Sequence, residues 1–448
     1  MLYSLRSIAD DFGIIVDLSD LKSLFSAAGT VRLYAKPLAE NDNSKNQVYF
    51  GPDFESLNIF PNGGIEAAPG AAKSIFKAKM DFGWLTGTGA VAPAPNARLI
   101  LYPQYPEVRF SGFLKGCAAA PSPLMASRLA GRVLFLGVTA SRRVVGYVAA
   151  AESAVASEFR RAANLPQDGV FFRLSLPSKP DEADTRALLL GELGRIHRKG
   201  WIDSKQLGAD GGIRPCRAAQ CGGFTLEAEL NIPKNSAAEP DFLGWEIKQH
   251  SVPRFSSLGG AITLMTPEPT GGYYREAGVD AFVRRYGYPD KKGVPDRLNF
   301  GGVHRVARRH PLTGLRMELA GYDAGRRKIL DADGCVALVD ANDTVAAAWD
   351  FAGLFAHWSK KHTRAAYVPS LRRTTPAWQY AYGPRVRLAE RTDALRLLAA
   401  LAAGAVYYDP GIKIESASTR PRVKRRSQFR IASKDIAALY DGVEAVEV

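Results

Sequence analysis

The sequence predicts an α/β (α+β) protein with two domains: a β-rich domain over residues 1–180, and a domain over residues 186–448 with a central mixed β-sheet flanked by helices. Three observations predict this division. The first half consists mainly of short β-like segments separated by turn residues. In the second half helices alternate with strands, which is typical of α/β cores. Between the halves, "PSKPDEADT" (residues 177–185) is polar and contains prolines, as linkers do.

The charge of the chain is unevenly distributed. The 448 residues carry a formal net charge of +14. Residues 1–185 hold 19 bases and 17 acids, whereas residues 186–448 hold 40 bases and 28 acids. The basic excess lies in the second half and indicates a polyanionic partner, of which nucleic acid is the commonest. A generally basic protein without such a partner is the alternative.

The four cysteines indicate a cytosolic protein with reduced thiols. Cys216 and Cys221 are close enough in sequence to share a metal ion with His197, but no second cysteine pair follows. No apolar run is long enough to span a bilayer, and acids near the N-terminus do not fit a secretory signal. We therefore expect a cytoplasmic protein that does not act at a membrane.

In the first domain we expect a helix over residues 1–25, then seven strands, a helix and a final strand. The strands are "VRLYAKPL", "QVYFG", "IFKAKMDFGW", "ARLILYP", "EVRFSGFL", "RVLFLGVTA" and "RVVGYVAA", the helix is "ESAVASEFRRAAN" and the final strand is "GVFFRLSLP". The amides of the loop "AENDNSKNQ" are of the type that reads bases. DNA recognition is thus one role for this domain, and a plain surface loop is the other interpretation.

In the second domain the pattern predicts a helix over residues 185–201, a short helix near residue 227, and a bent strand at "PDFLGWEIKQ". Later strands are "AITLMTP", "RLNFGG", "LRMELAGYD" and "GCVALVD". Later helices are "EAGVDAFVRRYG", the long "TVAAAWDFAGLFAHWSKKH" (residues 344–362) and "TDALRLLAALAAG".

One stretch combines the residues needed to cleave a phosphodiester. In "PDFLGWEIK" (residues 240–248), Asp241 precedes Glu246 and Lys248. Side chains alternate along a strand, so Glu246 and Lys248 share a face, and Gly244 is where the chain can turn to bring Asp241 beside Glu246. Paired carboxylates favour Mg²⁺, and a nearby lysine can activate water or stabilise developing charge. The motif is short, and a strand edge with alternating charges is the competing interpretation.

A further carboxylate precedes this stretch. Thr225 is expected to cap a short helix that carries Glu227 and Glu229. Glu227 can complete the metal shell or hold a water ligand, or it is a solvated acid favoured by the helix dipole. Glu229, two residues further on, points to another face of the helix.

Three basic segments are candidate DNA contacts: "TRPRVKRRSQFRI" (residues 419–431), the helix end "HWSKKHTR" (residues 357–364) and the loop "GGVHRVARRHP" (residues 301–311). The residues predicted to contact DNA are Arg422, Lys424, Arg425, Arg426, Lys360, Lys361, His304 and Arg305. A solvated tail is the alternative for the first segment. A cationic end that only complements the helix dipole is the alternative for the second.

Several stretches together resemble the MvaI/BcnI family of type II restriction endonucleases, part of the PD-(D/E)xK nuclease superfamily. They are "GGFTLEAELNIPKNSAAEPDFLGWEIKQHS" and "AITLMTPEPTGGYY", then "GLFAHWSKKHTRAAYVPS" and "FRIASKDIAALYD", within about residues 185–445. The resemblance implies a restriction-endonuclease-like core and a Mg²⁺-dependent enzyme, often monomeric, that cleaves double-stranded DNA at a short site. It implies Asp241 and Glu246 as metal ligands, Lys248 as the catalytic lysine and Glu227 as a supporting acid. Minimal members of the family lack the N-terminal half.

The predicted function is therefore a site-specific, Mg²⁺-dependent DNA endonuclease of a restriction or phage-defence system, with a cognate methyltransferase acting on the same site. Two alternatives stay open: a strand-nicking or modification-dependent endonuclease, and a non-catalytic DNA-binding protein on a nuclease scaffold. The presence of Asp241, Glu246 and Lys248 argues against the non-catalytic alternative, because a decayed nuclease tends to lose these residues first.

Overall fold

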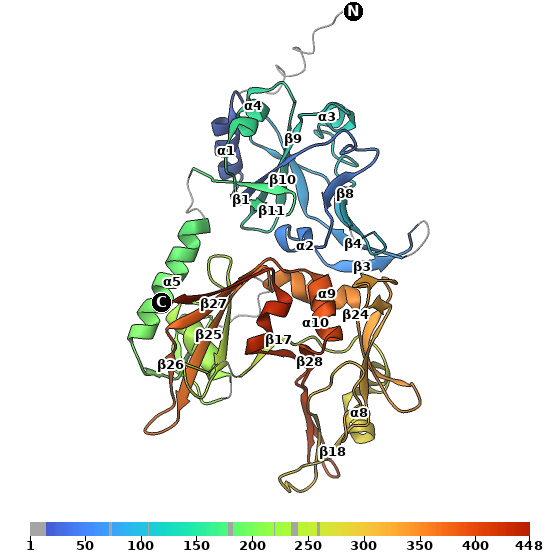
Figure 1. Cartoon of the computed structure of the whole chain (residues 1–448), viewed down its shortest axis with the longest axis vertical. Helices are drawn as coiled ribbons and strands as arrows, with labels where there is room; N and C mark the ends of the chain where they lie inside the picture. Colours follow the sequence, from blue (N-terminus) through green and yellow to red (C-terminus); the bar gives the residue numbers. More distant parts are fainter. Residues whose placement is uncertain are drawn as a thin grey trace, which may run out of the picture. The chain divides into compact units, whose positions relative to one another are not determined.

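The computed structural model describes residues 15–70, 74–105, 107–177, 182–218, 220–233, 241–257 and 260–448 (Figure 1). The chain forms two compact units, Met1–Asp184 and Thr185–Val448. Residues 178–181 of the expected linker and residues 1–14 of the expected first helix lie outside the described residues. None of the helices in the described ranges combines the length and apolar character that crossing a membrane requires.

The N-terminal unit is built from two β-sheets, with strand orders β11-β12-β1-β9-β10-β5-β6 and β2-β8-β7-β4-β3. The strands of the larger sheet are β1 (Thr30–Pro37), β5 (Phe82–Leu85), β6 (Val91–Pro93), β9 (Val133–Thr139), β10 (Val144–Ala149), β11 (Gln167–Asp168) and β12 (Phe171–Leu174). Those of the smaller sheet are β2 (Val48–Gly51), β3 (Ile65–Ala68), β4 (Ile75–Lys79), β7 (Arg98–Tyr102) and β8 (Glu107–Ser111). The segment expected as one strand, "IFKAKMDFGW", divides into β4 and β5, because the chain passes there from one sheet to the other.

The N-terminal unit also contains helices. They are α1 (Leu18–Ala27), α2 (Ser56–Ile59), α3 (Ser122–Ala126) and α4 (Ala154–Arg161). Asp17 caps α1 by accepting a hydrogen bond from the backbone N–H of Asp20. Phe25 of α1 and Phe159 of α4 pack in one buried cluster with Phe135 of β9. The unit therefore has a hydrophobic core of its own.

The C-terminal unit is organised around β25, which pairs in parallel with β16 and antiparallel with β27 and β26. In this six-stranded sheet, β13 pairs with β26 and β32 pairs with β27. The strands are β13 (Ile202–Asp203), β16 (Glu246–Ser251), β25 (Arg364–Arg373), β26 (Gln379–Tyr382), β27 (Arg385–Glu390) and β32 (Gly442–Glu447). The sheet is mixed, as predicted.

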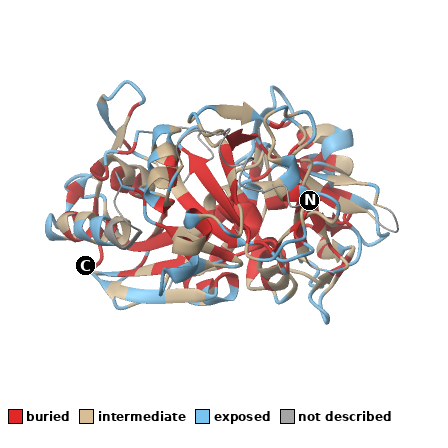
Figure 2. Ribbon diagram, turned by 90° about the horizontal axis from the view of Figure 1, so that it is seen from above, coloured by how far each residue is buried: buried red, intermediate tan, exposed pale blue. Residues whose placement is uncertain are grey.

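The C-terminal unit has helices on several of its sheets. They are α5 (Glu182–Arg198), α6 (Cys221–Glu229), α7 (Tyr273–Glu276), α8 (Gly278–Tyr286), α9 (Phe351–Lys361), α10 (Ala394–Ala402) and the 3₁₀ helix η2 (Ser433–Leu439). Leu189, Leu193 and Ile196 lie along one face of α5 and pack with Trp245 and Ile247 at the start of β16. Figure 2 shows buried residues concentrated on the strands inside the molecule. The predicted fold class is confirmed.

Smaller sheets complete the C-terminal unit: β14-β15, β17-β31-β28, β18-β19-β29-β30, β20-β23-β24 and β21-β22. Their strands are β14 (Lys205–Leu207), β15 (Ile213–Pro215), β17 (Ala261–Met265), β18 (Tyr288–Pro289), β19 (Arg297–Gly301), β20 (Arg316–Ala320), β21 (Tyr322–Asp323), β22 (Lys328–Ile329), β23 (Cys335–Val339), β24 (Val345–Asp350), β28 (Val406–Tyr408), β29 (Gly411–Glu415), β30 (Arg422–Lys424) and β31 (Phe429–Ala432).

Residues 344–362 do not form the single helix that the sequence predicts. Their first part is strand β24, paired antiparallel with β23, and α9 begins only at Phe351. Asp350 starts the helix, because its Oδ1 accepts a hydrogen bond of 2.6 Å from the backbone N–H of Gly353. The alanine-rich segment before Asp350 has high helix propensity, but pairing with β23 buries it and overrides that preference.

Cys216 and Cys221 are joined by a disulfide, so the expectation of reduced thiols is wrong for this pair. The loop before α6 brings their Cα atoms to 5.8 Å, within the range of a disulfide. The two cysteines therefore do not form a metal site with His197, whose Nδ1 lies 2.7 Å from the carbonyl oxygen of Tyr382.

Candidate active site

A two-residue turn precedes β16. Leu243 (φ 47°) and Gly244 (φ 86°) both have positive φ, and Phe242 and Trp245 exchange backbone hydrogen bonds of 2.9 and 2.8 Å across them. This is the pattern of a type I′ hairpin turn. A Cβ atom at position 244 would meet the Arg364 guanidinium at 2.9 Å, so glycine is favoured by space as well as by φ.

The turn folds Asp241 back onto the start of β16. Its Oδ2 accepts a hydrogen bond of 2.9 Å from the backbone N–H of Ile247. The residue before it, Pro240, lies outside the described residues. The bend that the sequence places at Gly244 thus brings Asp241 next to the Glu-x-Lys strand.

Glu246 and Lys248 share one face of β16, while Trp245 and Ile247 enter the core on the other. Lys248 Nζ donates a hydrogen bond of 2.6 Å to Glu246 Oε1. The Glu246 side chain is 3% exposed, and no donor among the described residues reaches its buried Oε2. A buried carboxylate oxygen without a donor is costly unless a cation completes its surroundings.

Glu227 comes from α6, which begins four residues before Thr225, so the expectation that Thr225 caps this helix is wrong. Gly222 lets the helix start close against the sheet, because a Cβ there would meet the Gln249 side chain at 2.9 Å. Thr225 is instead buried inside the helix, where its hydroxyl hydrogen-bonds with the backbone of Lys205.

Glu229 forms ion pairs with basic side chains instead of joining the carboxylates of the site. Its oxygens lie 2.5 Å from Lys205 Nζ, 2.7 Å from Lys199 Nζ and 3.7 Å from Arg195. Burial alone would raise the pKa of Glu229, but hydrogen bonds from Lys199 and Lys205 lower it. Two acids separated by two helical positions therefore have different environments, as expected.

The carboxyl groups of the site disfavour one another's charge. Burial raises the pKa of Glu227 to about 7, with the charge of Asp241 adding to it. Burial raises the pKa of Asp241 to about 6, with the charge of Glu246 adding to it, while Lys248 and Lys361 oppose both shifts. Burial alone would lower the pKa of Lys248, but the three carboxylates outweigh it and raise that pKa. A divalent cation would relieve this repulsion.

The end of α9 supplies a second lysine. Lys361 Nζ lies 3.8 Å from Glu246 Oε1, the oxygen that Lys248 also binds. The sequence predicts Lys360 and Lys361 together as phosphate contacts, and the structure brings Lys361 to the carboxylates. The cationic helix end was the signal in the sequence. Its approach to Glu246, more than 100 residues earlier, depends on the fold.

A buried network next to the site was not singled out from the sequence. The His362 ring stacks on Trp358 with centroids 4.0 Å apart, and its Nδ1 lies 3.4 Å from the Tyr440 hydroxyl, which is 2.9 Å from the Tyr367 hydroxyl. Burial and then the charge of Lys248 hold the pKa of His362 well below its ordinary value. His362 is therefore neutral and adds no positive charge beside Lys248.

The donor set fits Mg²⁺. Asp241 and Glu246 offer carboxylate oxygens from adjacent segments, and Glu227 is close enough for their charges to raise its pKa. Glu246 Oε2 lacks a donor within the described part of the chain. Across the described ranges, no three His, Cys, Asp or Glu side chains lie close enough to enclose an ion by themselves. One or two carboxylates completed by water and substrate phosphate is the arrangement that Mg²⁺ commonly takes.

His304 is not presented to DNA in this structure, so its predicted contact is wrong. Its side chain is fully buried, with Nδ1 2.9 Å from the Gly302 carbonyl oxygen and Nε2 2.9 Å from the Thr313 hydroxyl. Its ring stacks on both Phe300 and His310. Burial lowers the pKa of His304 to about 3, with the charge of His310 adding to the effect. The loop folds inward because these rings pack together.

The other predicted DNA contacts have varied surroundings. Arg305 is half-buried, with its guanidinium 4.5 Å from the centroid of the Tyr407 ring. Lys360 is half-buried near the end of α9. On and just after β30, four bases are exposed: Arg422, Lys424, Arg425 and Arg426. Their contact with DNA stays a prediction.

Comparison with known proteins identifies the family. A model of the MvaI/BcnI restriction endonuclease family matches residues 190–440, more than half of the chain. Two similar solved structures are the restriction endonuclease MvaI–cognate DNA substrate complex and MvaI in the absence of DNA. They are 19% and 18% identical, cover 58% and 60% of this chain and 97% and 100% of their own, and have TM-scores of 0.43 and 0.33. No curated protein matches the chain. The resemblance seen in the sequence is confirmed, and the chain belongs to the MvaI/BcnI restriction endonuclease family of site-specific DNA endonucleases.

Proposed function

We propose that the chain is a Mg²⁺-dependent endonuclease that cuts double-stranded DNA at a specific site, in a cytoplasmic restriction or phage-defence role. A methyltransferase acting on the same site would be its partner. The observation that carries the proposal is the meeting of Asp241, Glu246 and Lys248 at the start of β16, with one buried Glu246 oxygen that lacks a donor among the described residues.

Each residue of the site has a separate task in the proposed mechanism. Asp241 and Glu246 would hold Mg²⁺, which when bound supplies positive charge beside the scissile phosphate. Lys248 positions the attacking water and stabilises the charge that develops on the phosphate oxygens. Glu227, from the neighbouring helix α6, orients or deprotonates that water. The water oxygen bonds to phosphorus as the bond to the 3′ oxygen breaks, which leaves a 5′-phosphate and a 3′-hydroxyl.

The test is digestion of unmodified and methylated plasmid DNA by the full chain, with Mg²⁺ or with EDTA, followed by mapping of the ends. We expect cuts at discrete sites with Mg²⁺ and none with EDTA. The variants Asp241→Ala and Lys248→Ala should still bind DNA. Their cutting rate should fall by at least about 100-fold, which is the effect of losing one electrostatic stabiliser.

The outcomes separate the alternatives. Absence of cutting under every condition would refute the enzyme, and undiminished cutting by both variants would refute the site while sparing the activity. Nicked circles without linear product would favour the strand-nicking function. Cutting confined to methylated plasmid would favour the modification-dependent function.

A further inference from the structure

The four-stranded sheet β18-β19-β29-β30 has one apolar and one charged face. Phe300, Ile412 and Ile414 are buried, and Phe300 packs against Phe282 of α8 with ring centroids 4.6 Å apart. Residues that alternate with these point to the other side of the sheet. The strand register aligns them across the sheet in two rows: Tyr288, Asn299, Lys413 and Lys424, and beside it Arg297, Glu415 and Arg422.

The two hairpins of this sheet concentrate positive charge. Residues 288–299 and 411–426 together hold nine Lys and Arg and three Asp and Glu, a net charge of +6 out of the +14 of the whole chain. Glu415 is already bound by Arg297 at 3.1 Å, Lys413 at 2.8 Å and Lys424 at 3.0 Å. Five further bases form no ion pair with an acid in the described part of the chain: Lys291, Lys292, Arg422, Arg425 and Arg426.

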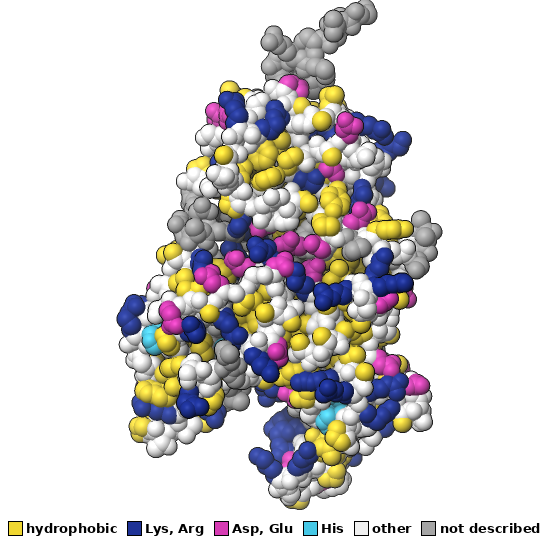
Figure 3. Space-filling model, in the orientation of Figure 1, with side chains coloured by type: hydrophobic (Ala, Val, Ile, Leu, Met, Phe, Trp, Pro, Cys, Tyr) yellow, Lys and Arg dark blue, Asp and Glu magenta, His cyan; other side chains and the backbone are white. Residues whose placement is uncertain are grey.

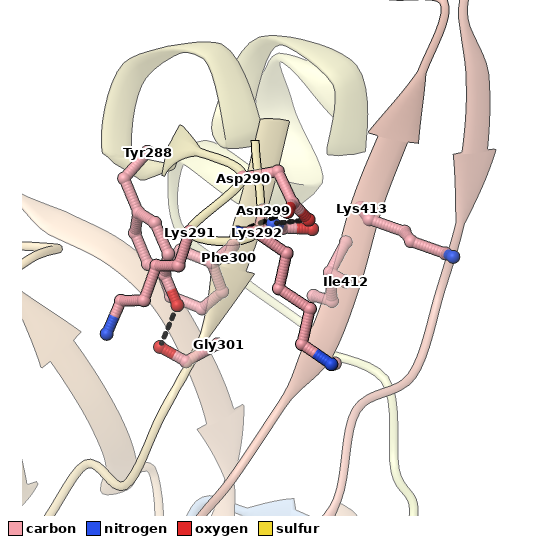
Figure 4. A pocket seen from close by; sticks show the side chains of 10 residues that line it. Tyr288, Asp290, Lys291, Lys292, Asn299, Phe300, Gly301, Ile412 and Lys413 are labelled. Carbon is pink, nitrogen blue, oxygen red and sulfur yellow. Dashed lines mark hydrogen bonds between the residues drawn. The ribbon is translucent and has the colours of Figure 1, made fainter. Parts of the chain in front are cut away.

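A hollow of about 420 Å³ opens between these hairpins (Figure 4). The Tyr288 hydroxyl donates to the Gly301 carbonyl oxygen at 3.3 Å, and the Asn299 amide donates to Asp290 at 2.9 Å. Asp290 also lies 3.5 Å from Arg297, and Lys413 is paired with Glu415, so these polar groups of the wall are engaged. Lys291 and Lys292 lie at the hollow, and Lys291 Nζ is 5.5 Å from the centroid of the Tyr288 ring. What the hollow offers a ligand is therefore cationic charge rather than a pattern of donors and acceptors, which suits phosphate oxygens better than base edges.

The charged face borders a depression of the C-terminal unit. In Figure 1, α8 lies to the right of the strands that end near β18, so the face opposite α8 is turned to the left. Figure 3 shows the surface hollowed on that side, between the lobe of β26 and the lobe of β18, with Lys and Arg side chains gathered along the β18 lobe. A polyanion lying in this depression between the two lobes would pass along the charged face.

From these observations we propose that the charged face of the β18-β19-β29-β30 sheet is a sequence-independent clamp for the phosphate backbone of duplex DNA, outside the position of the cut. The inference rests on the proposed function, because the bound duplex is the substrate. Duplex DNA carries a negative charge about every 1.7 Å along its axis, and each phosphate neutralised by Lys or Arg releases condensed counterions. The clamp thus acts on affinity and its salt dependence, and leaves the chemical step to Asp241, Glu246 and Lys248.

The test neutralises three of the bases that have no acid partner among the described residues, as Lys291→Gln, Lys292→Gln and Arg422→Gln combined in the full chain. Binding of a mixed-sequence DNA duplex is measured by fluorescence anisotropy in EDTA over a range of salt. We expect the slope of log affinity against log salt to fall by about 2 to 3, at about 0.9 per lost phosphate contact. The affinity should fall alike for duplexes of different sequence.

A matched variant removes the same charge elsewhere. Arg198→Gln, Arg326→Gln and Lys434→Gln lie at exposed positions outside this sheet and should change the slope by less than about 1. Replacing Lys291 and Lys292 by arginine and Arg422 by lysine should preserve the slope. An unchanged slope in the clamp variant, an equal change in the matched variant, or a loss confined to one DNA sequence or to single-stranded RNA would overturn the clamp. A wild-type chain that binds duplex with this slope but never cuts it would refute the proposed function and leave the clamp standing.

Discussion

At the residue scale, Glu246 has two differently used oxygens. Oε1 faces Lys248 at 2.6 Å and Lys361 at 3.8 Å, whereas Oε2 is buried without a donor among the described residues. Each lysine ammonium offsets part of the cost of burying this carboxylate. One oxygen then remains for a cation. Loss of either lysine should affect the reaction rather than the overall binding of DNA.

Lys361→Ala is expected to slow cleavage about tenfold to 100-fold, since its ammonium group stabilises charge beside the carboxylate that Lys248 also binds; each tenfold is about 1.4 kcal/mol of activation free energy. Single-turnover cleavage with saturating enzyme measures this rate. Lys360→Ala is the control, because the adjacent residue points about 100° away around α9. Equal effects of the two substitutions would show that only the local positive charge matters.

The raised pKa of Glu227 makes stability depend on pH. Its pKa is raised from 4.5 to about 7 in the folded chain, so the folded state holds this proton more tightly than the unfolded state. The resulting stabilisation is complete below about pH 4 and is lost as pH rises through 7, an effect on the order of 3 kcal/mol. Asp241, with a pKa of about 6, contributes with the same sign.

We therefore expect the Tm in EDTA to fall between about pH 5 and pH 8, and Glu227→Gln to flatten that slope. Added Mg²⁺ should raise the Tm most at the higher pH, where the carboxylates are ionised. Thermal melts across this pH range measure both effects. Parallel slopes for the wild type and Glu227→Gln would contradict the assignment of the shift to this group.

At the scale of elements, the site is assembled where a turn, the start of a strand and the end of a helix meet. The turn at Leu243–Gly244 delivers Asp241, the start of β16 delivers Glu246, and the end of α9 delivers Lys361. Each end is anchored in a buried core, β16 by its pairing with β25 and α9 by Trp358. The turn is held by two backbone hydrogen bonds. Its geometry is therefore the part of the site that a single substitution changes most easily.

Gly244→Ala should therefore reduce activity more than it reduces stability. Alanine at φ 86° costs about 1–2 kcal/mol, and its Cβ would press on Arg364 and shift the turn that holds Asp241. Gly211→Ala is the control, with φ 78° and no atom within 4 Å of the added Cβ. Both variants should lose similar stability in thermal melts, and only Gly244→Ala should lose about tenfold or more in cutting rate. Similar activities would show that Asp241 does not depend on this turn.

At the scale of the whole molecule, the chain joins a β-rich unit to the unit that holds the family match. The N-terminal unit has a core of its own and little net charge, with 19 bases and 17 acids in residues 1–185. Phosphate contacts alone would give it little affinity for DNA. We propose that this unit contributes to DNA recognition through contacts with bases, which carry sequence information that phosphates lack.

Residues 185–448 expressed alone should keep their cutting rate at saturating DNA but bind the cognate site about tenfold more weakly or worse. The salt dependence of binding should change little, because the missing unit carries almost no net charge. Mapped digests and binding titrations of this fragment and the full chain test this. If the fragment cuts the same sites with equal affinity, the N-terminal unit does not read DNA.

The sequence by itself determined the features that depend on local pattern. Alternation along a strand placed Glu246 and Lys248 on one face, and Gly244 marked the turn that returns Asp241. Ordered motifs over about residues 185–445 indicated the family, which the family model confirms over residues 190–440, and the alternation of helices and strands indicated a mixed sheet. These features depend on periodicity, turn chemistry and residue type, which neighbouring residues reveal without the fold.

Only the tertiary structure decided which distant segments meet. It converted the first part of the expected long helix into β24 and buried His304 among aromatic rings. It also joined Cys216 to Cys221 and carried Lys361 to Glu246. Each outcome depends on packing between segments, and burial and pairing energies there exceed the local preferences that a sequence displays. The paired carboxylates Asp241 and Glu246 could be predicted from the sequence. The position of Lys361 beside them and the charged face of the sheet could be found only from the fold.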